Sequence, residues 1–239
     1  MRIISGQFKR RPLAGPPHGA TTRPMPDLVK EAVFNLLRGH CEDGPVLDLF
    51  CGTGTMGLEA VSRGSPRVVL VEKDRRVVEV LEKNIAYLGV ADACEVVCGD
   101  ALGPGALNRC PRPVHLIFVD PPYEMVSEPE GWARVTRQVA RLAEMLDDTG
   151  YIVLRTPWPF VHTVAAPDAE DADAPASVTI DLDEEDADNA LDAFEAELAE
   201  GAGKAKGVPV KVDLSIENTV GPETHEYGTT AVHLYMKQR

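Results

Sequence analysis

A glycine-rich turn between a short apolar stretch and an amphipathic one restricts the fold of this chain most strongly. Residues 46–50 are apolar apart from Asp48, and residues 56–63 place apolar side chains at helical spacing before Gly64. The turn between them, residues 51–55, contains two glycines, which let the backbone approach a ligand without interference from a Cβ atom. A strand, a glycine turn and a helix in this order are typical of ligand-binding α/β proteins. The turn therefore predicts an α/β fold with a ligand at this junction.

The same alternation of strand and helix continues along the chain. Short apolar stretches predict strands at residues 46–50, 68–72, 95–98, 114–119, 151–154, 210–216 and 230–236. Helical spacing predicts one helix from Asp27 to near Gly39 and others at residues 56–63, 75–88 and 132–146. Because strands that alternate with helices form parallel sheets with both faces covered, we predict a Rossmann-like, doubly wound fold with a mostly parallel seven-stranded sheet.

Charge is distributed unevenly along the 239 residues. The formal net charge is −14, and residues 168–200 alone contain 14 acidic side chains and no Lys or Arg. This composition predicts an acidic, largely disordered insertion at residues 165–207, with a short helix at residues 189–200. The other expected parts are a basic arm at residues 1–26, a catalytic core at residues 27–164 and closing strands at residues 208–239. We expect the insertion to stay away from any nucleic acid.

The N-terminal part is locally basic. Residues 1–38 contain seven basic side chains, namely Arg2, Lys9, Arg10, Arg11, Arg23, Lys30 and Arg38, against Asp27 and Glu31. A solvated surface is the commoner explanation of such a cluster, and a phosphate-binding surface is the alternative.

Other features restrict the location of the protein and the ions that it binds. Apolar runs are too short to span a bilayer, and the N-terminus lacks a signal pattern, so we expect a cytoplasmic protein with no membrane partner. Five scattered cysteines favour reduced thiols over a disulfide framework. Cys94 and Cys98 lack a second ligand pair, so we expect no metal site.

Acidic residues near the glycine turn indicate the kind of cofactor. Gly52, Gly54 and Gly57 match the dinucleotide fingerprint, and Glu72 ends the next strand, where it could hold ribose hydroxyls. Asp48 before the turn and Asp100 after the third strand would suit an ammonium and an adenine amino group better than a pyrophosphate. We therefore predict S-adenosylmethionine as the cofactor. The residues expected to bind it are Asp48, Phe50, Gly52, Thr53, Gly54, Glu72, Asp100 and Ala101.

A second motif follows the apolar strand at residues 114–119. Asp120, Pro121, Pro122 and Tyr123 come at its carboxyl end, where open α/β sheets bind ligands. An exocyclic base amine is a poor nucleophile, so its N–H groups need acceptors such as the Asp120 carboxylate and the Pro121 carbonyl. Tyr123 offers a flat face on which an extruded base can stack. The motif predicts methylation of a base amine, although a rigid turn with a packing tyrosine would explain a bare Pro-Pro pair.

With these motifs the sequence resembles the Asp-Pro-Pro-Tyr amino methyltransferases, and more narrowly the RsmD family of bacterial 16S rRNA guanine-N2 methyltransferases. The likeness lies in residues 2–13, in Thr22-Arg23-Pro24 with the helix that follows, in residues 48–60 and in residues 227–231. The N-terminal segments are its specific part, because several families share the Asp-Pro-Pro-Tyr motif. The resemblance implies a class I methyltransferase fold and transfer to the N2 of a guanine in 16S rRNA within small-subunit particles. It also implies that the basic arm contacts RNA through Arg2, Lys9, Arg10, Arg11 and Arg23.

Three alternatives remain open at this point. An adenine-N6 DNA methyltransferase uses the same corner but needs a recognition region, and the extra segment here is acidic. A non-catalytic ribosome-assembly factor would need neither the glycine turn nor the corner. A nicotinamide-dependent dehydrogenase would explain the glycine turn but not the Asp-Pro-Pro-Tyr corner.

We expect a monomer that transfers the methyl group directly, without a covalent enzyme intermediate.

Overall fold

The computed structural model describes residues 1–20, 25–165 and 207–239. The chain divides into two compact units, and each is treated by itself. The first comprises Met1–Trp158 and Asp213–Arg239, and the second is Pro159–Val212. Among the described residues, no helix is both long and apolar enough to cross a bilayer.

The described residues of the first unit form a seven-stranded sheet in the order β3-β2-β1-β4-β5-β9-β8. The first five strands in this order are parallel, whereas β9 runs antiparallel to β5 and β8 antiparallel to β9. The strands are β1 (Val46–Leu49), β2 (Val68–Glu72), β3 (Cys94–Cys98), β4 (Val114–Val119), β5 (Leu146–Pro157), β8 (Thr219–Tyr227) and β9 (Thr230–Lys237). This arrangement confirms the predicted mostly parallel sheet with helices.

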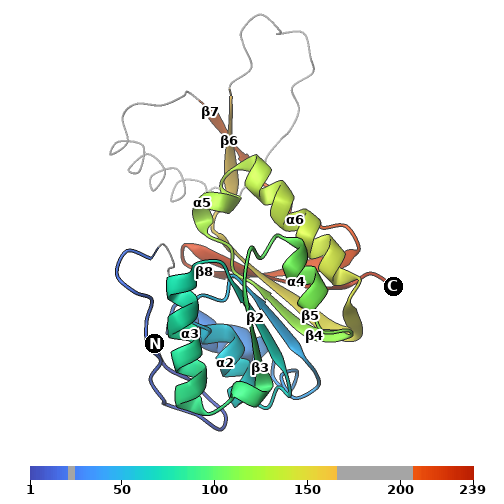
Figure 1. The fold of residues 1–239 in the computed structure, drawn as a ribbon. Coiled ribbons are helices and arrows are strands. Elements are labelled where there is room, and N and C mark those ends of the chain that lie inside the picture. The colour runs from blue at the N-terminus through green and yellow to red at the C-terminus, as the bar shows by residue number, and fades with distance from the viewer. Residues whose placement is uncertain (21–24, 166–206) are drawn as a thin grey trace, which may run out of the picture. The chain divides into compact units, whose positions relative to one another are not determined.

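Helices cover both faces of this sheet, as Figure 1 shows, with α2 and α3 on one face and α4 and α6 on the other. The helices are α1 (Asp27–Leu36), α2 (Thr55–Ser62), α3 (Arg75–Leu88), α4 (Pro104–Arg109), α5 (Tyr123–Val126) and α6 (Pro129–Ala143), with a 3-10 turn, η1 (Ala91–Ala93). Local sequence sets their ends. The Asp74 carboxylate accepts the backbone N–H of Arg76 at the start of α3, and Gly89 ends that helix with φ 70°.

Burial explains why the central strands are parallel and apolar. Every residue of β1, β2 and β4 is buried, which is typical of strands that are covered on both faces. Phe34 on α1 packs against Phe118 on β4 with ring centroids 5.6 Å apart. Because β1 pairs in parallel with both β2 and β4, the carboxyl ends of these three strands lie on the same side of the sheet.

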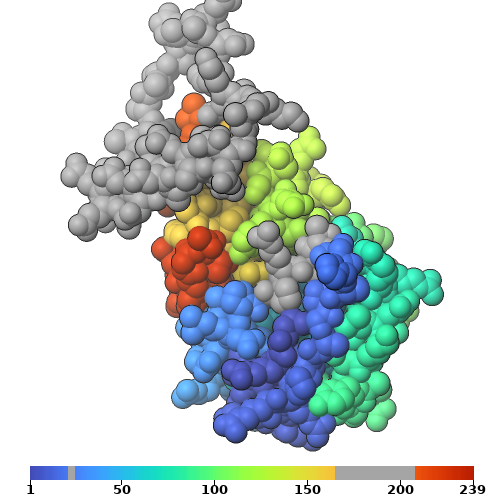
Figure 2. Space-filling model, turned by 90° about the vertical axis from the view of Figure 1, so that its left-hand side faces the viewer, coloured from blue at the N-terminus to red at the C-terminus, as the bar shows by residue number. Residues whose placement is uncertain are grey.

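The N-terminal segment is bound tightly to α2 and α3 rather than extending from the surface. The buried Glu59 carboxylate accepts the backbone N–H groups of Ile4 at 2.7 Å and Ser5 at 2.9 Å. The Lys30 ammonium lies 3.4 Å from Glu59 and donates to the Arg2 carbonyl at 2.7 Å. Figure 2 shows this segment, in dark blue, lying beside the teal surface of α3. The segment therefore belongs to the first unit.

One predicted strand of the sheet is wrong. Residues 210–216 do not join it; instead β7 (Gly207–Lys211) pairs with β6 (Val161–Ala165) in the second unit, and β8 forms the edge of the seven-stranded sheet. Most β8 side chains are exposed or half-buried, so the strand lacks the apolar alternation that reveals a buried strand. The helix expected at residues 189–200 and most of the expected insertion lie outside the described residues.

Candidate active site

The glycine turn is as tight as its sequence suggests. Gly54 precedes α2 with φ 86°, and a Cβ atom there would lie 2.5 Å from Leu81 Cδ1. A Cβ atom at Gly57 would lie 2.7 Å from Leu70 Cδ2 and 3.0 Å from an Asp48 carboxylate oxygen. Both glycines are thus required by close packing against the neighbouring elements.

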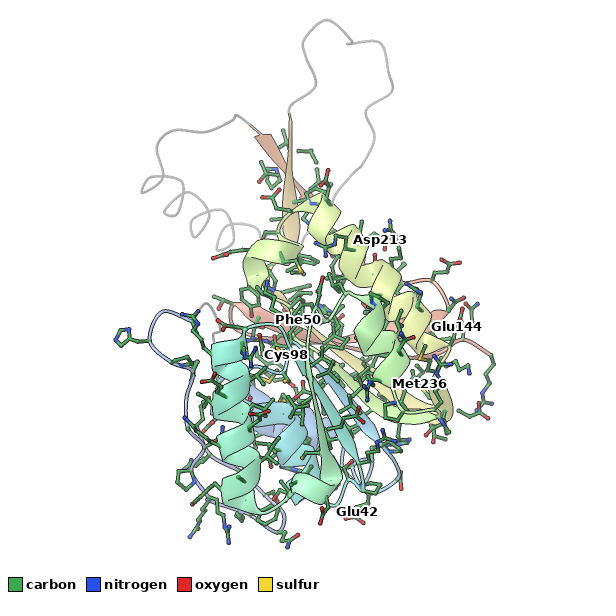
Figure 3. The ribbon with its side chains drawn as sticks, in the orientation of Figure 1. Glu42, Phe50, Cys98, Glu144, Asp213 and Met236 are labelled. Carbon is green, nitrogen blue, oxygen red and sulfur yellow. The ribbon has the colours of Figure 1, made fainter. Side chains whose placement is uncertain are left out.

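Phe50 carries backbone strain at the end of β1. Its φ is 57°, in the left-handed region that bulky side chains rarely adopt. Such a conformation costs about 1–3 kcal/mol and persists only when the surroundings enforce it, most often at functional sites. Phe50 follows the carboxyl end of β1, and Figure 3 shows it in the upper part of the sheet.

Three carboxyl groups influence one another beside this turn. Asp48 is buried, accepts the Gly57 N–H at 2.8 Å, and has its pKa raised to about 8. Burial is the largest cause, and the charges of Asp120 and Glu72 raise the pKa further. Glu72 accepts the backbone N–H of Gly52 at 3.1 Å and that of Asp74 at 2.8 Å. The turn is therefore an acidic environment.

The predicted residues after β3 lie beside the end of β2. The Gly99 N–H donates to the Glu72 carbonyl at 2.9 Å, which joins the two strand ends. Asp100 accepts the Leu102 N–H at 3.0 Å, and its other oxygen lies 3.5 Å from the Arg134 guanidinium on α6. Ala101 is buried. The structure thus brings the ends of three successive strands together around the turn.

A buried arginine holds the carboxylate of the predicted catalytic corner. Arg155 on β5 donates from Nε to Asp120 Oδ1 at 2.6 Å and from Nη2 to Oδ2 at 3.0 Å. The side chains of Arg155 and Asp120 are only 10% and 18% exposed. Burial raises the pKa of Asp120, and the arginine opposes that effect. The pair fixes where the carboxylate points and favours its ionised form.

The tyrosine of the corner is fixed from two sides. Its hydroxyl donates to Thr230 Oγ1 at 2.6 Å, and that hydroxyl donates to the Thr156 carbonyl at 2.9 Å. The Arg155 guanidinium carbon lies 5.2 Å from the centre of the Tyr123 ring. Pro121 is buried between Asp120 and the exposed Pro122. The corner is thus rigid, with its aromatic ring half-buried.

Sequence reasoning missed two residues of this site. Arg155 directly follows the predicted strand at residues 151–154, and a charged residue beside a buried strand was the available signal. Asn84 on α3 is buried, and its amide nitrogen donates to the Ala14 carbonyl at 3.1 Å and to the Thr53 carbonyl at 3.0 Å. Its oxygen accepts the Ala14 N–H at 2.8 Å. Asn84 therefore joins the N-terminal segment to the glycine turn.

The basic residues predicted to contact RNA are exposed where the structure describes them. Lys9, Arg10 and Arg11 are all exposed, and the Arg11 guanidinium lies over the Phe8 ring, 5.4 Å from its centre. Arg2 is 64% exposed and lies 3.5 Å from Asp27. Arg23 lies outside the described residues.

The sequence match to a known family decides what kind of chain this is. The model of the RsmD family, described as "Conserved hypothetical protein 95", matches residues 1–163, which is more than half of the chain. The chain belongs to the RsmD family.

The relatives of this RsmD-family chain carry the names of methyltransferases. It is 33% identical over 156 residues to the "Putative rRNA methyltransferase YlbH" of Bacillus subtilis, a match that covers 64% of this chain and 80% of that protein. It is 40% identical over 123 residues to the "Ribosomal RNA small subunit methyltransferase D" of Escherichia coli, covering 52% of this chain and 60% of that protein. It is an enzyme of the methyltransferase class.

A solved structure extends the likeness to the fold of the RsmD-family chain. The "Putative methyltransferase yhhF from Escherichia coli" aligns over 100% of this chain and 98% of its own, with a TM-score of 0.62 and 25% identity. The chain thus has the class I methyltransferase fold, as the resemblance implied.

The residues of the RsmD-family chain fit the methyl donor of that enzyme class. S-adenosylmethionine has a positively charged sulfur and an ammonium group, whereas a nicotinamide dinucleotide has a negative pyrophosphate. The charges of Asp120 and Glu72 act on the buried Asp48 directly beside the turn. Negative charge beside the turn attracts a cation and repels a pyrophosphate. The acidic turn therefore favours the sulfonium cofactor.

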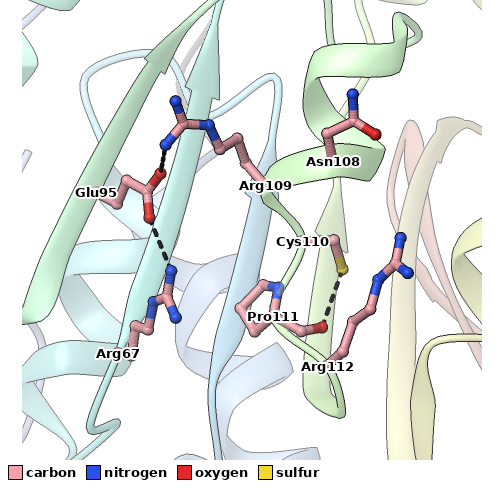
Figure 4. Close-up of a pocket in the computed structure, with 7 residues that line it drawn as sticks. All are labelled: Arg67, Glu95, Asn108, Arg109, Cys110, Pro111 and Arg112. Carbon is pink, nitrogen blue, oxygen red and sulfur yellow. Dashed lines mark hydrogen bonds and ion pairs between the residues drawn. The ribbon is translucent and has the colours of Figure 1, made fainter.

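A hollow of about 530 Å³ lies elsewhere, near the amino ends of the parallel strands (Figure 4). Its lining includes Arg67, Arg109 and Arg112, and the Glu95 carboxylate accepts from Arg67 and Arg109 at 2.8 Å each. These ion pairs occupy part of the hollow. Its lining includes none of the residues predicted for catalysis or cofactor binding.

Proposed function

We propose that this RsmD-family chain transfers a methyl group from S-adenosylmethionine to the exocyclic N2 amine of a guanine in 16S rRNA, within the small ribosomal subunit. The arginine-held Asp120 carboxylate beside the acidic glycine turn carries this proposal, because it puts a fixed acceptor next to a cation site. The names of the Bacillus and Escherichia relatives support rRNA as the substrate.

The cofactor, when bound, supplies an electrophilic methyl group on its positive sulfur. Glu72 at the end of β2 binds the ribose hydroxyls, and Asp100 after β3 accepts a hydrogen bond from the adenine amino group. Backbone groups of Phe50, Gly52, Thr53, Gly54 and Ala101 line the same edge of the sheet. The Asp48 carboxyl supports the turn by accepting the backbone N–H of Gly57.

The guanine is held out of its stack against the Tyr123 ring. Asp120 and the carbonyl of Pro121 accept the two N2–H bonds, which turns the nitrogen lone pair toward the methyl group. As the amine takes up the methyl group that the cofactor would supply, the Asp120 carboxylate would accept the proton that the nitrogen loses. Pro122 stiffens the turn. Positioning supplies most of the rate, because no covalent enzyme intermediate is needed.

The basic arm binds the RNA backbone. Lys9, Arg10 and Arg11 are exposed on a segment that Asn84 connects to the glycine turn. Contacts from Arg2 and Arg23 extend this surface. A small-subunit substrate places the activity in the cytoplasm, and we expect the chain to act as a monomer.

The proposal is tested by measuring labelled methyl transfer to unmodified small subunits with the wild type and with Asp120→Ala. We expect the variant to lose turnover while its affinity for S-adenosylmethionine, measured by calorimetry, stays within a few-fold of the wild-type value. Normal turnover by Asp120→Ala would contradict the assignment of the corner. Tighter binding of a nicotinamide dinucleotide than of S-adenosylmethionine would contradict the cofactor.

A further inference from the structure

Two histidines and an aspartate lie close together near the amino ends of β1 and β4. His40 and Asp43 lie in the turn after α1, and His115 is the second residue of β4, 75 positions from His40. His40 Nδ1 lies 3.0 Å from His115 Nε2, and Asp43 Oδ2 lies 3.8 Å from the first nitrogen and 3.7 Å from the second. Among the residues that the structure describes, this group offers three ligand atoms of the kinds that bind transition metals.

The spacing of the three atoms matches a zinc site. A triangle with sides of 3.0, 3.7 and 3.8 Å has a centre about 2.0 Å from each corner. Zinc binds imidazole nitrogen and carboxylate oxygen at about 2.0–2.2 Å. A metal ion therefore needs only small movements of these side chains, which also open the direct contact between the two imidazoles.

Neighbouring groups orient both imidazoles in advance. Asp147 on β5 lies 2.7 Å from Nδ1 of His115, which leaves Nε2 to face His40 and Asp43. A carboxylate on the far nitrogen of a metal-bound histidine fixes its tautomer and raises its basicity. Tyr151 meets the His40 ring edge-on at 5.0 Å, and a Cβ atom at Gly44 would lie 2.8 Å from His115 Cβ. The second histidine is thus locked in place by packing.

Burial provides both a rigid side and an open side. The His115 side chain is 1% exposed, that of His40 is 28% exposed and that of Asp43 is 60% exposed. A metal ion can enter from the side of Asp43 while His115 stays fixed. Three protein ligands leave a position for water, as in open zinc sites.

We propose that His40, Asp43 and His115 form a binding site for one Zn²⁺ ion or a similar divalent transition metal, with Asp147 as the outer partner of His115. The bound ion ties the turn before β1 to the first residues of β4. Because an ion that binds only the folded chain stabilises it, occupancy raises the midpoint of thermal unfolding.

This site lies at the opposite end of the sheet from the acidic turn. His115 and Asp120 lie five residues apart along β4, a distance of about 17 Å. Figure 3 shows Glu42, the neighbour of Asp43, at the end of the sheet away from Phe50. Loss of the metal is therefore expected to leave methyl transfer unchanged, which separates this proposal from the catalytic one.

The test uses the full-length, untagged protein after treatment with a chelator. Zn²⁺ affinity is measured by competition with a chromophoric chelator, and the visible spectrum of added Co²⁺ reports the ligand geometry. His40→Ala and Asp43→Asn remove ligands, and Asp147→Asn removes the outer charge. His225→Ala is the matched control, because His225 is 27% exposed and lies 3.0 Å from the Glu223 carboxylate.

We expect the wild type and His225→Ala to bind one equivalent with equal affinity. Asp147→Asn is expected to weaken binding by about 10- to 100-fold, and the two ligand variants by more than about 100-fold. Asp43→Asn keeps the test valid if His40→Ala fails to fold, since Asp43 is largely exposed. Zn²⁺ affinities of both ligand variants equal to that of the wild type would overturn the proposal, as would a wild type that binds no metal. Either result would leave His40, His115 and Asp147 as a hydrogen-bonded chain with Asp43 beside it.

Discussion

Arg155 and Asp120 form a buried, two-point ion pair at the carboxyl edge of the sheet, with Nε–Oδ1 and Nη2–Oδ2 distances of 2.6 and 3.0 Å. The arginine comes from β5 and the aspartate from the end of β4, 35 positions earlier in the chain. Two parallel hydrogen bonds fix a carboxylate in direction as well as in place. The proposed catalytic corner therefore depends on a residue outside its own motif.

Replacing Arg155 by Met should reduce kcat by about 100- to 1000-fold, the usual effect of losing a preorganised hydrogen-bonding group. Because Arg155 opposes the effect of burial on the pKa of Asp120, its loss raises that pKa, and the activity profile moves to higher pH. Steady-state kinetics across pH measures both effects.

The matched control for Arg155→Met is Arg76→Met, because Arg76 donates to Asp74 from the same two guanidinium atoms on the exposed surface. Its kcat should equal that of the wild type. An unchanged pH profile in Arg155→Met would contradict the positioning role, even if kcat fell.

Tyr123 should contribute through its ring more than through its hydroxyl. Tyr123→Ala is expected to reduce kcat/KM by about 5- to 150-fold, since base stacking is worth about 1–3 kcal/mol. Tyr123→Phe loses the 2.6 Å hydrogen bond to Thr230 and the 3.4 Å hydrogen bond from Arg155, so we expect a reduction of about 2- to 10-fold. Tyr123→Trp keeps a flat face and should retain more activity than Tyr123→Ala. Equal activity of the Ala and Trp variants would argue against stacking.

Asp48 should make the protein less stable as pH rises toward 8. Its folded-state pKa is raised to about 8, mainly by burial, from an ordinary value of 3.8. Between these values the folded chain holds a proton that the unfolded chain releases, so the free energy of unfolding falls with rising pH. From pH 6 to 8 the wild type should lose about 2 kcal/mol more than Asp48→Asn in urea unfolding without ligand. Parallel pH dependences would contradict the raised pKa.

Asn84 should couple the N-terminal segment to the cofactor turn. In Asn84→Asp the amide donors to Ala14 and Thr53 are lost, and a buried carboxyl group faces their carbonyl oxygens. We expect the free energy of unfolding to fall by about 2–4 kcal/mol and the affinity for S-adenosylmethionine to fall by at least about 10-fold. Denaturant unfolding and calorimetry measure these effects. The exposed Asn35→Asp should change neither, and an unchanged affinity in Asn84→Asp would argue against the coupling.

The basic arm should act on substrate binding alone. Replacing Lys9, Arg10 and Arg11 together by Gln should raise KM for small subunits by at least about 10-fold at 0.1 M salt with kcat unchanged. The dependence of KM on salt should also weaken, because fewer counterions are released. Replacing Arg67 and Arg109, which are exposed and paired with Glu95, should leave KM unchanged. Equal salt dependences of wild type and arm variant would contradict the RNA contact.

Much of the fold follows from local pattern. Residues 114–119 and 68–72 are nearly all apolar, and both form fully buried parallel strands at the predicted positions. The glycine turn and the Asp-Pro-Pro-Tyr corner were also visible, because each is continuous in sequence. Local pattern misses the edge strand β8, because its residues are exposed or half-buried and lack alternation. The sequence predicts a strand of the sheet at residues 210–216 instead, and this prediction is wrong.

The less predictable parts of the site depend on contacts between distant residues. Asn84 bonds to Ala14 across 70 positions, and the His40–His115 contact spans 75. Neither pair shows any local signature, and the expectation of no metal site considered only the spacing of cysteines. The strained φ of Phe50 is a property of the folded backbone, which composition cannot reveal.

Labelled methyl transfer to unmodified small subunits, with naked 16S rRNA and duplex DNA as parallel substrates, tests the central claim most directly. After digestion to nucleosides, the account predicts label in N2-methylguanosine from the subunits and none in DNA. Label in N6-methyladenine from DNA would contradict the substrate, and no label in any substrate would favour an assembly factor that binds RNA without catalysis.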